Sequence, residues 1–264
     1  TPRDIEDWNI DKWGNEFRKP SDQWKNENEE ISEQRDYVKQ PSTIHLPFSQ
    51  EDSDSDNFYK YEDMENFSDI PLVITIKMDG SNAYVSNERV ASRKGWGATH
   101  ETYDHLKRMH ASFKHKIPSE LQIFGEWLKH KHSIHYAPSN ECTCEDNAPP
   151  LDSFFQVFNV YDNKYNLWLS WYEVKEWADK IGVTTTPVLK ENLVYENKYE
   201  AAEKLREIAE GVVEEGHEGI VVRPMYPFHY GQFDRVVGKY VRNNHVKTEE
   251  HWKYQDKIEN HLKD

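Results

Sequence analysis

The stretch VITIKMDGSNAYV, residues 73–85, carries a lysine at the end of an apolar run. Lys77 precedes a Met-Asp-Gly turn, after which a second strand-like stretch begins. Placing a charged amine next to a buried strand costs free energy unless a partner or a reaction uses it. Burial, nearby cations and a bound metal each lower the pKa of a lysine, and a neutral amine is a nucleophile. A nucleophilic lysine is one interpretation of this stretch. Taken alone, the stretch favours the alternative, a strand-end lysine whose amine reaches solvent.

Four further motifs come after this lysine in order along the chain. They are SRKG (92–95), FGEW (124–127), FFQVFNVYD (154–162), and EGIVVR (218–223) followed by VVGKYVR (236–242). A single K-x-D-G is weak evidence, because ordinary residue usage gives it by chance in roughly one chain of this length in twenty. The ordered set is far more specific than any one of its members.

The ordered set resembles the covalent nucleotidyltransferases, which comprise ATP-dependent DNA ligases, RNA ligases and mRNA capping enzymes. The resemblance covers about residues 71–245. It implies an α+β nucleotidyltransferase domain, the ATP-grasp-like adenylation domain of ligases, with antiparallel sheets flanked by helices. It also implies a reaction in three steps. ATP adenylates the lysine, the AMP moves to a 5′-phosphate end, and a 3′-hydroxyl displaces AMP to close the phosphodiester.

The resemblance assigns roles to individual residues. Lys77 corresponds to the nucleophile, and Asp79 and Gly80 shape the turn that comes after it. Glu218 resembles the carboxylate that holds Mg²⁺ or Mn²⁺ near the reacting phosphates. Lys239 resembles the lysine that neutralises the α-phosphate in the transition state. We therefore expect the catalytic residues to be Lys77, Lys239 and Glu218, with Glu218 as the metal ligand.

Further nucleotide contacts are implied by the same resemblance. Arg93 is similar to the arginine that contacts the ribose or the incoming phosphate, and Glu126 to the acid that fixes the ribose hydroxyls. Phe158 is similar to the aromatic that stacks on the base, with Phe155 as second choice. The structural alternatives are a surface charge for Arg93, a sheet-end salt bridge for Glu126 and a core aromatic for Phe158. The expected nucleotide-binding set is Lys77, Asp79, Gly80, Asn82, Arg93, Glu126, Phe158, Arg223, Lys239 and Arg242.

The sequence departs from the family pattern at three positions. The last motif usually reads lysine, one residue, lysine, whereas here Lys239 is followed three residues later by Arg242. The second cation is therefore missing or supplied by Arg242. Arg223 stands where many relatives have lysine, and Ile76 stands where many have glutamate. None of these changes removes the nucleophile or the expected metal ligand, so we expect activity.

The length of chain beyond the last motif indicates the subgroup. Only 25 residues come after Lys239, too few for the OB domain of DNA ligases and capping enzymes. We therefore expect an RNA ligase without a C-terminal OB domain. The segments 41–49, 131–136 and 239–252 also resemble a bacterial and phage RNA ligase subgroup. A ligase for DNA or RNA/DNA hybrid nicks, a capping guanylyltransferase, a catalytically inactive RNA-end-binding module and a plain scaffold stay open.

Charge is distributed unevenly along the chain, whose net charge is −15. Residues 1–70 hold 19 acidic and 8 basic side chains, so we expect an acidic segment that packs on or leads into a catalytic domain at 71–264. Such a net charge opposes salt-dependent coating of long nucleic acid. Basic segments near 106–116, 129–132 and 239–247 could still form a local groove for RNA ends, with DNA as a possible partner. His132 and His135 could contact phosphates there.

Periodicity predicts the main elements. Strands are expected at 72–76, 83–86, 121–124, 154–161, 167–170, 218–222 and 236–241, and helices near 21–36, at 171–181, at 199–216 and from Thr248 onward. The spacing of histidines and cysteines over 130–146 is not the usual spacing of a zinc site. No apolar stretch approaches about eighteen residues and no secretory signal is present, so we expect no membrane partner and a cytoplasmic location. We also expect a monomer.

Overall fold

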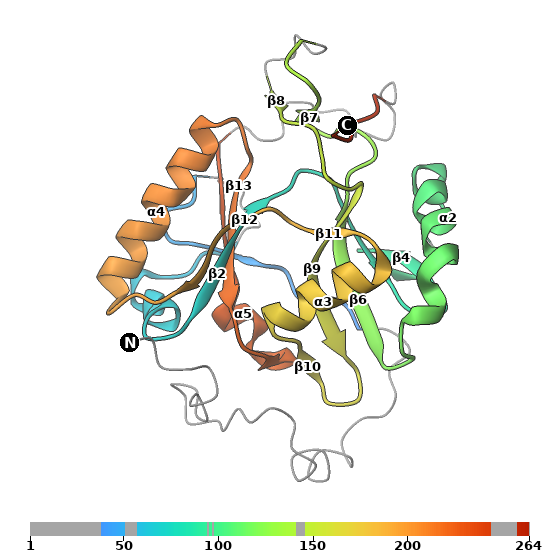
Figure 1. Ribbon diagram of the computed structural model, residues 1–264. Coiled ribbons are helices and arrows are strands. Elements are labelled where there is room, and N and C mark those ends of the chain that lie inside the picture. The colour runs from blue at the N-terminus through green and yellow to red at the C-terminus, as the bar shows by residue number, and fades with distance from the viewer. Residues whose placement is uncertain are drawn as a thin grey trace.

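The computed structural model describes residues 38–50, 57–93, 95–96, 98–140, 146–243 and 258–263 of the 264-residue chain. Within these ranges, two larger sheets lie side by side with helices packed against them (Figure 1). Most neighbouring strands are antiparallel, and only the pairs β1–β15, β11–β9 and β7–β8 of the described strands are parallel. The predicted combination of antiparallel sheets and helices is therefore confirmed for the described residues.

The five-stranded sheet carries the lysine turn. Its strands, in spatial order, are β1 (Ile44–His45), β15 (Gly238–Val241), β13 (Gly219–Pro224), β2 (Leu72–Lys77) and β12 (Val188–Leu193). Side chains alternate along β2, so Leu72 and Ile74 pack with helix α4 (Lys198–Glu214), whereas Val73 packs toward the second sheet. Lys77 shares the face of Val73 and therefore points toward the space between the sheets.

The eight-stranded sheet forms the other wall. Its strands run β14 (Phe228–His229), β10 (Leu167–Trp168), β9 (Phe155–Asp162), β6 (Leu121–Trp127), β3 (Ser81–Val85), β4 (Val90–Ser92) and β5 (Gly95–Trp96), with β11 (Thr184–Thr185) added beside β9. Helices α2 (Asp104–Phe113) and α3 (Trp171–Ile181) share one core with this sheet, in which Leu106 and Val174 contact the cluster around Ile123 and Val157. On the opposite face, Phe124 and Trp168 pack with Phe233 in a second core, and the rest of this face borders the space between the sheets.

The remaining described elements are short. They are the strand pair β7 (His135–Tyr136) and β8 (Asn147–Ala148), the helix α5 (Phe233–Val236), and the 3₁₀ turns η2 (Tyr61–Phe67), η3 (Glu101–Tyr103), η4 (Lys114–Lys116) and η5 (Tyr230–Gln232). The described part of the acidic segment packs on the rest of the chain, because β1 pairs with β15 and η2 contacts α4. Residues 1–37, which include the helix predicted near 21–36, lie outside the described residues.

Helix ends explain why two predictions were accurate. The side chains of Ser170 and Glu173 cap the first turn of α3 reciprocally, and Gly182 ends it with a φ of 77°. Asn197 caps α4, since its Oδ1 accepts the N–H groups of Tyr199 and Glu200 at 3.0 and 3.1 Å. The helices predicted at 171–181 and 199–216 are therefore confirmed, with a shift of one or two residues at the ends of α4.

Other elements differ from the sequence prediction. The basic segment 106–116 was predicted only as a cluster of charges, and it forms most of α2, whose Leu106 and Phe113 are buried. Strand β12 was not predicted, because its side chains alternate between exposed and half-buried and give no apolar run. The helix predicted from Thr248 onward is wrong over residues 258–263. These residues are extended, and Glu259 and Leu262 form isolated bridges with His130 and Leu151. Residues 248–257 lie outside the described residues.

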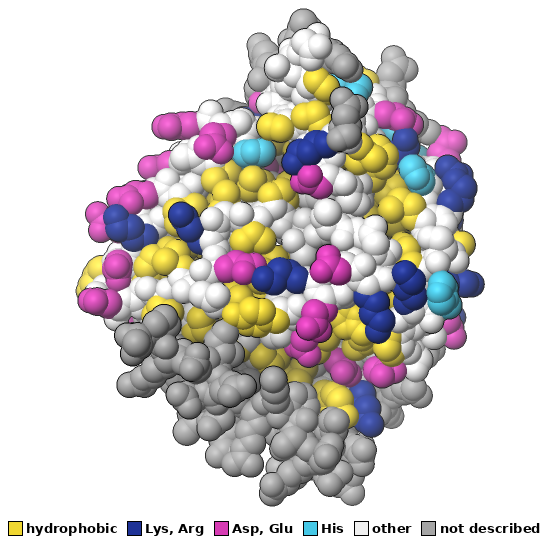
Figure 2. All heavy atoms as spheres, viewed as in Figure 1, with side chains coloured by type: hydrophobic (Ala, Val, Ile, Leu, Met, Phe, Trp, Pro, Cys, Tyr) yellow, Lys and Arg dark blue, Asp and Glu magenta, His cyan; other side chains and the backbone are white. Residues whose placement is uncertain are grey.

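The described surface mixes both signs of charge. Figure 2 shows acidic and basic side chains interspersed over one face of the molecule. The cationic side chains of α2 and η4 are exposed, namely Lys107, Arg108, Lys114 and Lys116. Among the described residues, no helix combines the length and apolar content needed to cross a bilayer.

A glycine next to the lysine turn tests the strand register. Gly219 lies opposite Lys77 and has a φ of 154°, and a Cβ there would lie 1.9 Å from the carbonyl oxygen of Tyr240. We expect Gly219→Ala to lower the free energy of unfolding by about 3 kcal/mol or more in urea titrations. Gly211→Ala in α4 is the control, because its Cβ meets nothing within 4 Å and should stabilise by up to about 1 kcal/mol. A loss below about 1 kcal/mol at Gly219 would contradict the register.

Candidate active site

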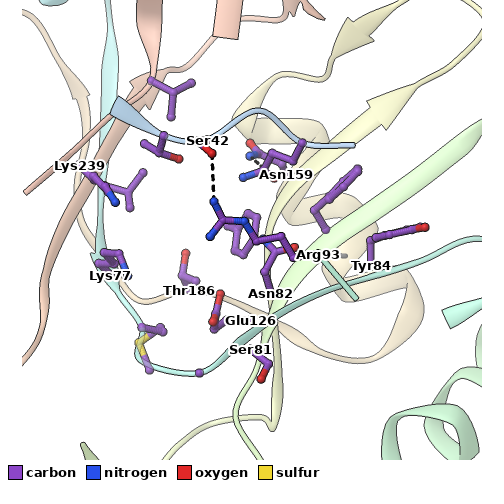
Figure 3. Close-up of a pocket in the computed structure, with 18 of the residues that line it drawn as sticks. Ser42, Lys77, Ser81, Asn82, Tyr84, Arg93, Glu126, Asn159, Thr186 and Lys239 are labelled. Carbon is purple, nitrogen blue, oxygen red and sulfur yellow. Dashed lines mark hydrogen bonds between the residues drawn. The ribbon is translucent and has the colours of Figure 1, made fainter. Parts of the chain in front are cut away.

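A cavity of about 970 Å³ lies between the two sheets. The five-stranded sheet lines it with Thr75, Lys77, Val221, Arg223 and Lys239, and the eight-stranded sheet lines it with Asn82, Tyr84, Ser92, Phe124, Glu126, Phe158 and Asn159. Val221 stands opposite both Thr75 and Lys239 in the strand register, so the two lysines reach the cavity from strands on either side of β13. Figure 3 shows Lys77 and Lys239 on the same side of the cavity.

Lys77 forms an ion pair with Glu218. The lysine side chain is 25% exposed toward the cavity, whereas the glutamate is only 3% exposed. The antiparallel register of β2 and β13, which sets Gly219 opposite Lys77, brings the preceding Glu218 to the amine. Burial lowers the pKa of Lys77, but the carboxylates of Glu218, Glu126 and Asp79 raise it by more, so the pKa lies above the ordinary 10.5.

The direction of this shift corrects one prediction. From the sequence, we expected the surroundings of Lys77 to lower its pKa, and the side chains of the site by themselves raise it. The physical reason is that three carboxylates act on one amine in a site of low dielectric. For Lys77 to act as a nucleophile, its ion pair with Glu218 would have to break, or a bound cation would have to neutralise Glu218.

Asp79 and Gly80 hold the turn that comes after the lysine. The Asp79 Oδ2 accepts the N–H groups of Ser133 and Ile134 at 2.7 and 2.6 Å, which turns this carboxylate away from the amine. A Cβ on Gly80 would lie 2.6 Å from the carbonyl oxygen of Trp127. The glycine was expected to shape the turn, and the close neighbour that requires a glycine here is strand β6. Gly80 lines the cavity, whereas Asp79 is buried and is not among the residues that line it.

Glu126 stands on β6 opposite Asn82 of β3, and both side chains face the cavity. Burial raises the pKa of Glu126 to about 8, with Lys77 opposing the shift and Glu218 and Asp79 adding to it. The side chain therefore stays protonated near neutral pH in the free protein. A protonated carboxyl can donate one hydrogen bond and still accept others, which suits contact with ribose hydroxyls.

Arg93 reaches into the cavity from the end of β4. Its guanidinium donates a hydrogen bond to Ser42 Oγ at 3.0 Å, and Figure 3 shows this contact at the centre of the site. Ser42 belongs to a segment of which residues 39–45 all line the cavity. The region 41–49, which was predicted from resemblance to a ligase subgroup, therefore contributes to one wall of the site.

A β-bulge aims Phe158 at the cavity. In the β6–β9 register, Phe124 pairs with Asn159 and Gly125 pairs with Val157, which leaves Phe158 as the extra residue. Phe158 lines the cavity. Phe155, the second choice for the stacking aromatic, is fully buried against Gly125 and does not line it. The structure thus separates two aromatics that the sequence could not rank by period alone.

The two arginines differ in position. Arg223 borders the cavity, but it is 3% exposed and its donors bind Asn159 Oδ1 and the carbonyl oxygen of Leu169, the latter at 2.6 Å. It braces β13 against the second sheet. Arg242 does not line the cavity and instead forms an ion pair with Asp146 at 2.6 Å. The expectation that Arg242 replaces the second motif lysine in the pocket is therefore not met by this arrangement.

The two histidines predicted to contact phosphates, His132 and His135, also differ in position. His132 lines the cavity, with Nε2 3.2 Å from Ser81 Oγ. His135 is 6% exposed, and its Nε2 lies 3.1 Å from the carbonyl oxygen of Glu259, so it serves packing instead of phosphate contact. Among the described residues, no group of three or more His, Cys, Asp or Glu side chains could hold a metal ion, and Cys142 and Cys144 lie outside them.

Sequence reasoning missed several cavity residues. Thr186 is 3% exposed, lines the cavity, and has a buried Oγ1 with no hydrogen-bond partner. The short strand β11 that ends just before it was not predicted, so no pattern pointed to this threonine. Thr75 could have been found, because it stands two residues before Lys77 and must share its face of the strand.

The raised pKa of Glu126 predicts a pH-dependent effect on stability. The native state keeps the proton up to about pH 8, whereas the unfolded chain loses it near 4.5, so the contribution of Glu126 to stability is lost as pH rises between these values. We expect Glu126→Gln to gain about 5 kcal/mol in unfolding free energy relative to the wild type on moving from below pH 4.5 to above about pH 8. Urea titrations across this range measure it. Parallel curves for the two proteins would refute the raised pKa.

Comparison with known proteins supplies the family. The sequence model of the RNA ligase family matches residues 70–241. A search of curated proteins found no match.

Several solved structures are similar in fold. An archaeal ATP-dependent RNA ligase is 16% identical, with a TM-score of 0.48 over 68% of this chain and 44% of that chain. A putative ATP-dependent DNA ligase from Aquifex aeolicus is 20% identical, with a TM-score of 0.48 over 76% and 49%. A Naegleria gruberi RNA ligase mutant with ATP and Mn is 15% identical, with a TM-score of 0.49 over 81% and 59%. The chain spans about half the length of these structures.

The family match extends from just before β2 to the end of β15, and so includes every strand that places Lys77, Glu126, Glu218 and Lys239. It also covers more than half of the 264 residues. The protein belongs to the RNA ligase family.

Proposed function

We propose that this protein is an ATP-dependent RNA ligase that carries AMP on Lys77. The observation that supports the proposal most directly is the Lys77–Glu218 pair, which presents one amine to a cavity lined by Arg93, Glu126 and Lys239. A lysine at the end of a buried strand, facing two other cations and a protonated carboxyl, suits attack on a phosphate group. Family membership alone would not single out this lysine.

In the proposed first step, the Lys77 amine attacks the α-phosphorus of ATP. A nitrogen–phosphorus bond forms, the bond from phosphorus to the pyrophosphate oxygen breaks, and pyrophosphate leaves. The Lys77 ammonium group gives up two of its three protons to solvent, so the phosphoramidate nitrogen keeps one hydrogen. Lys239 and Arg93 neutralise charge on the phosphates, because both enter the cavity. Glu126 contacts the ribose hydroxyls, and Phe158 stacks on the base. Asn82, which faces Glu126 across the β3–β6 pair, lines the same wall.

Glu218 is the expected ligand of a divalent cation. Bound Mg²⁺ or Mn²⁺ would supply positive charge to the phosphates as a Lewis acid. The described residues offer no larger cluster of metal ligands. Mg²⁺ often binds through one or two carboxylates plus substrate phosphates and water, so the residues present fit this kind of site. Neutralising Glu218 would also free Lys77 from the partner that raises its pKa.

In the proposed later steps, AMP passes to a 5′-phosphorylated RNA end and a 3′-hydroxyl displaces it. The exposed cations of α2 and η4 offer a binding surface for the RNA backbone, and such binding weakens as salt rises. RNA, DNA and hybrid ends can be compared in the same assay. The division into an acidic segment at 1–70 and a catalytic domain at 71–264, the monomeric state and the cytoplasmic location stay predictions.

The first test is transfer of label from α-labelled ATP to the protein in the presence of Mg²⁺, followed by denaturing electrophoresis. Protein freed of preloaded AMP should take up label, and Lys77→Ala should reduce it to background, because no other amine replaces the nucleophile. Lys204→Ala is the matched control, since this lysine is an exposed member of a surface pair on α4. Labelled wild type should then seal nicked RNA.

The outcomes separate the alternatives. Absence of label from ATP would overturn the proposal, and label from GTP in its place would point to capping chemistry. Label that persists in Lys77→Ala would move the nucleotide to a different residue. Faster sealing of DNA nicks than of RNA nicks would replace the RNA assignment while keeping the lysine-AMP mechanism.

A further inference from the structure

Segment 258–263 lies along the loop that comes after β6. The N–H of Lys131 donates to the carbonyl oxygen of Ile258 at 2.8 Å, the N–H of Asn260 donates to Lys129 at 3.0 Å, and the N–H of His261 donates to Tyr136 at 2.7 Å. Figure 1 shows this segment beside β7. Three backbone hydrogen bonds over so short a stretch fix segment 258–263 to the loop.

Asn260 joins the two ends of that loop. Its side chain is 3% exposed, its Nδ2 donates to the carbonyl oxygen of Leu128 at 2.8 Å, and its Oδ1 accepts the N–H of Tyr136 at 3.0 Å. One buried amide therefore holds residues 128 and 136 together. A buried amide that uses both its donor and its acceptor in this way is costly to replace, because both backbone groups would lose their partner.

The loop closed by Asn260 in turn holds the lysine turn. Within residues 128–136, the N–H groups of Ser133 and Ile134 bind the Asp79 carboxylate, and the Tyr136 hydroxyl accepts the N–H of Asp79 at 2.9 Å. Asp79 stands two residues after Lys77. The hydrogen bonds thus run without a gap from Asn260 through the loop to the turn that ends β2.

We propose that Asn260 is a positioning residue for the reactive lysine. By closing the loop 128–136, it orients the amides that hold Asp79, and Asp79 fixes the direction in which the chain leaves Lys77. This inference deepens the proposed function and rests on it for the identity of the reacting amine. Residues that touch the nucleotide are not needed for the effect, because Asn260 acts only through the loop.

The expected effect is on the rate of the chemical step and not on ATP binding. A displacement of about 1 Å in a reacting group can slow a reaction by about a hundredfold. Phe158 and Lys239, which line the cavity, lie on β9 and β15, whereas the hydrogen bonds of Asn260 described above go to the loop 128–136. Loss of Asn260 should therefore slow adenylation of Lys77 by about 10- to 100-fold while changing the apparent Kd for ATP by less than about threefold.

The test compares Asn260→Ala with Lys263→Ala in single-turnover adenylation by the full chain, across a range of ATP concentrations. Lys263→Ala is the matched control, because it removes only an exposed ion pair with Asp152 from the same segment. Tyr136→Phe serves as a second variant, since it removes the hydroxyl that accepts the Asp79 N–H and keeps the ring. When Asn260→Ala and Tyr136→Phe are combined, the loss in adenylation rate should be smaller than the two separate losses together, because both substitutions break the same series of hydrogen bonds from Asn260 to Asp79.

Hydrogen exchange gives a readout that does not depend on activity. Amides of residues 128–136 and of the turn after Lys77 should exchange faster in Asn260→Ala and not in Lys263→Ala. Unchanged adenylation rates in Asn260→Ala and Tyr136→Phe, or equal losses in the control, would overturn the inference while leaving the proposed function intact. If the wild type takes no label, the proposed function fails, and unchanged exchange would then reject the positioning role separately.

Discussion

The ion pair between Lys77 and Glu218 is the constraint on which the rest of the site depends. Neither charge could remain at the end of a buried strand alone, and each gives the other a partner in a region of low dielectric. The pair exists because β2 and β13 are adjacent and antiparallel, with Gly219 opposite the lysine. A close approach to Tyr240 excludes a side chain at that glycine. Strand register and chemistry are therefore set by the same few contacts.

The pair also explains why the free protein holds its lysine protonated. The negative charges of Glu218 and Asp79, joined by that of Glu126 once it ionises above about pH 8, outweigh the effect of burial on the pKa of the amine. In the proposed reaction, this pairing would hold the Lys77 amine until a cation binds Glu218 and a phosphate group approaches the amine. The lysine turn is held from the other side by Asp79, whose carboxylate accepts the backbone N–H groups of Ser133 and Ile134.

Much of this arrangement could be predicted from the sequence, because the motifs end strands whose apolar runs are clear. Lys77 and Glu126 were placed at the ends of apolar runs and Lys239 within a predicted strand, and the structure brings them to one cavity. Long-range pairing could not be predicted, so the exposed strand β12 and the neighbouring Thr186 were missed. The bulge in β9 places two consecutive residues, Phe158 and Asn159, at the cavity, and a strand period of two could not predict it. The ion pair of Arg242 with Asp146 could not be predicted, because the two residues are distant in sequence.

The most direct measurement of the central claim is the pKa of the Lys77 amine, followed by competitive acylation across pH and read by mass spectrometry. In the free protein the pKa should lie above 10.5, because Glu218, Glu126 and Asp79 together outweigh burial. With Mg²⁺ and a non-hydrolysable ATP analogue bound, it should fall, since Glu218 then interacts with the cation. A pKa below 10.5 in the free protein, or one that bound nucleotide leaves unchanged, would contradict the account.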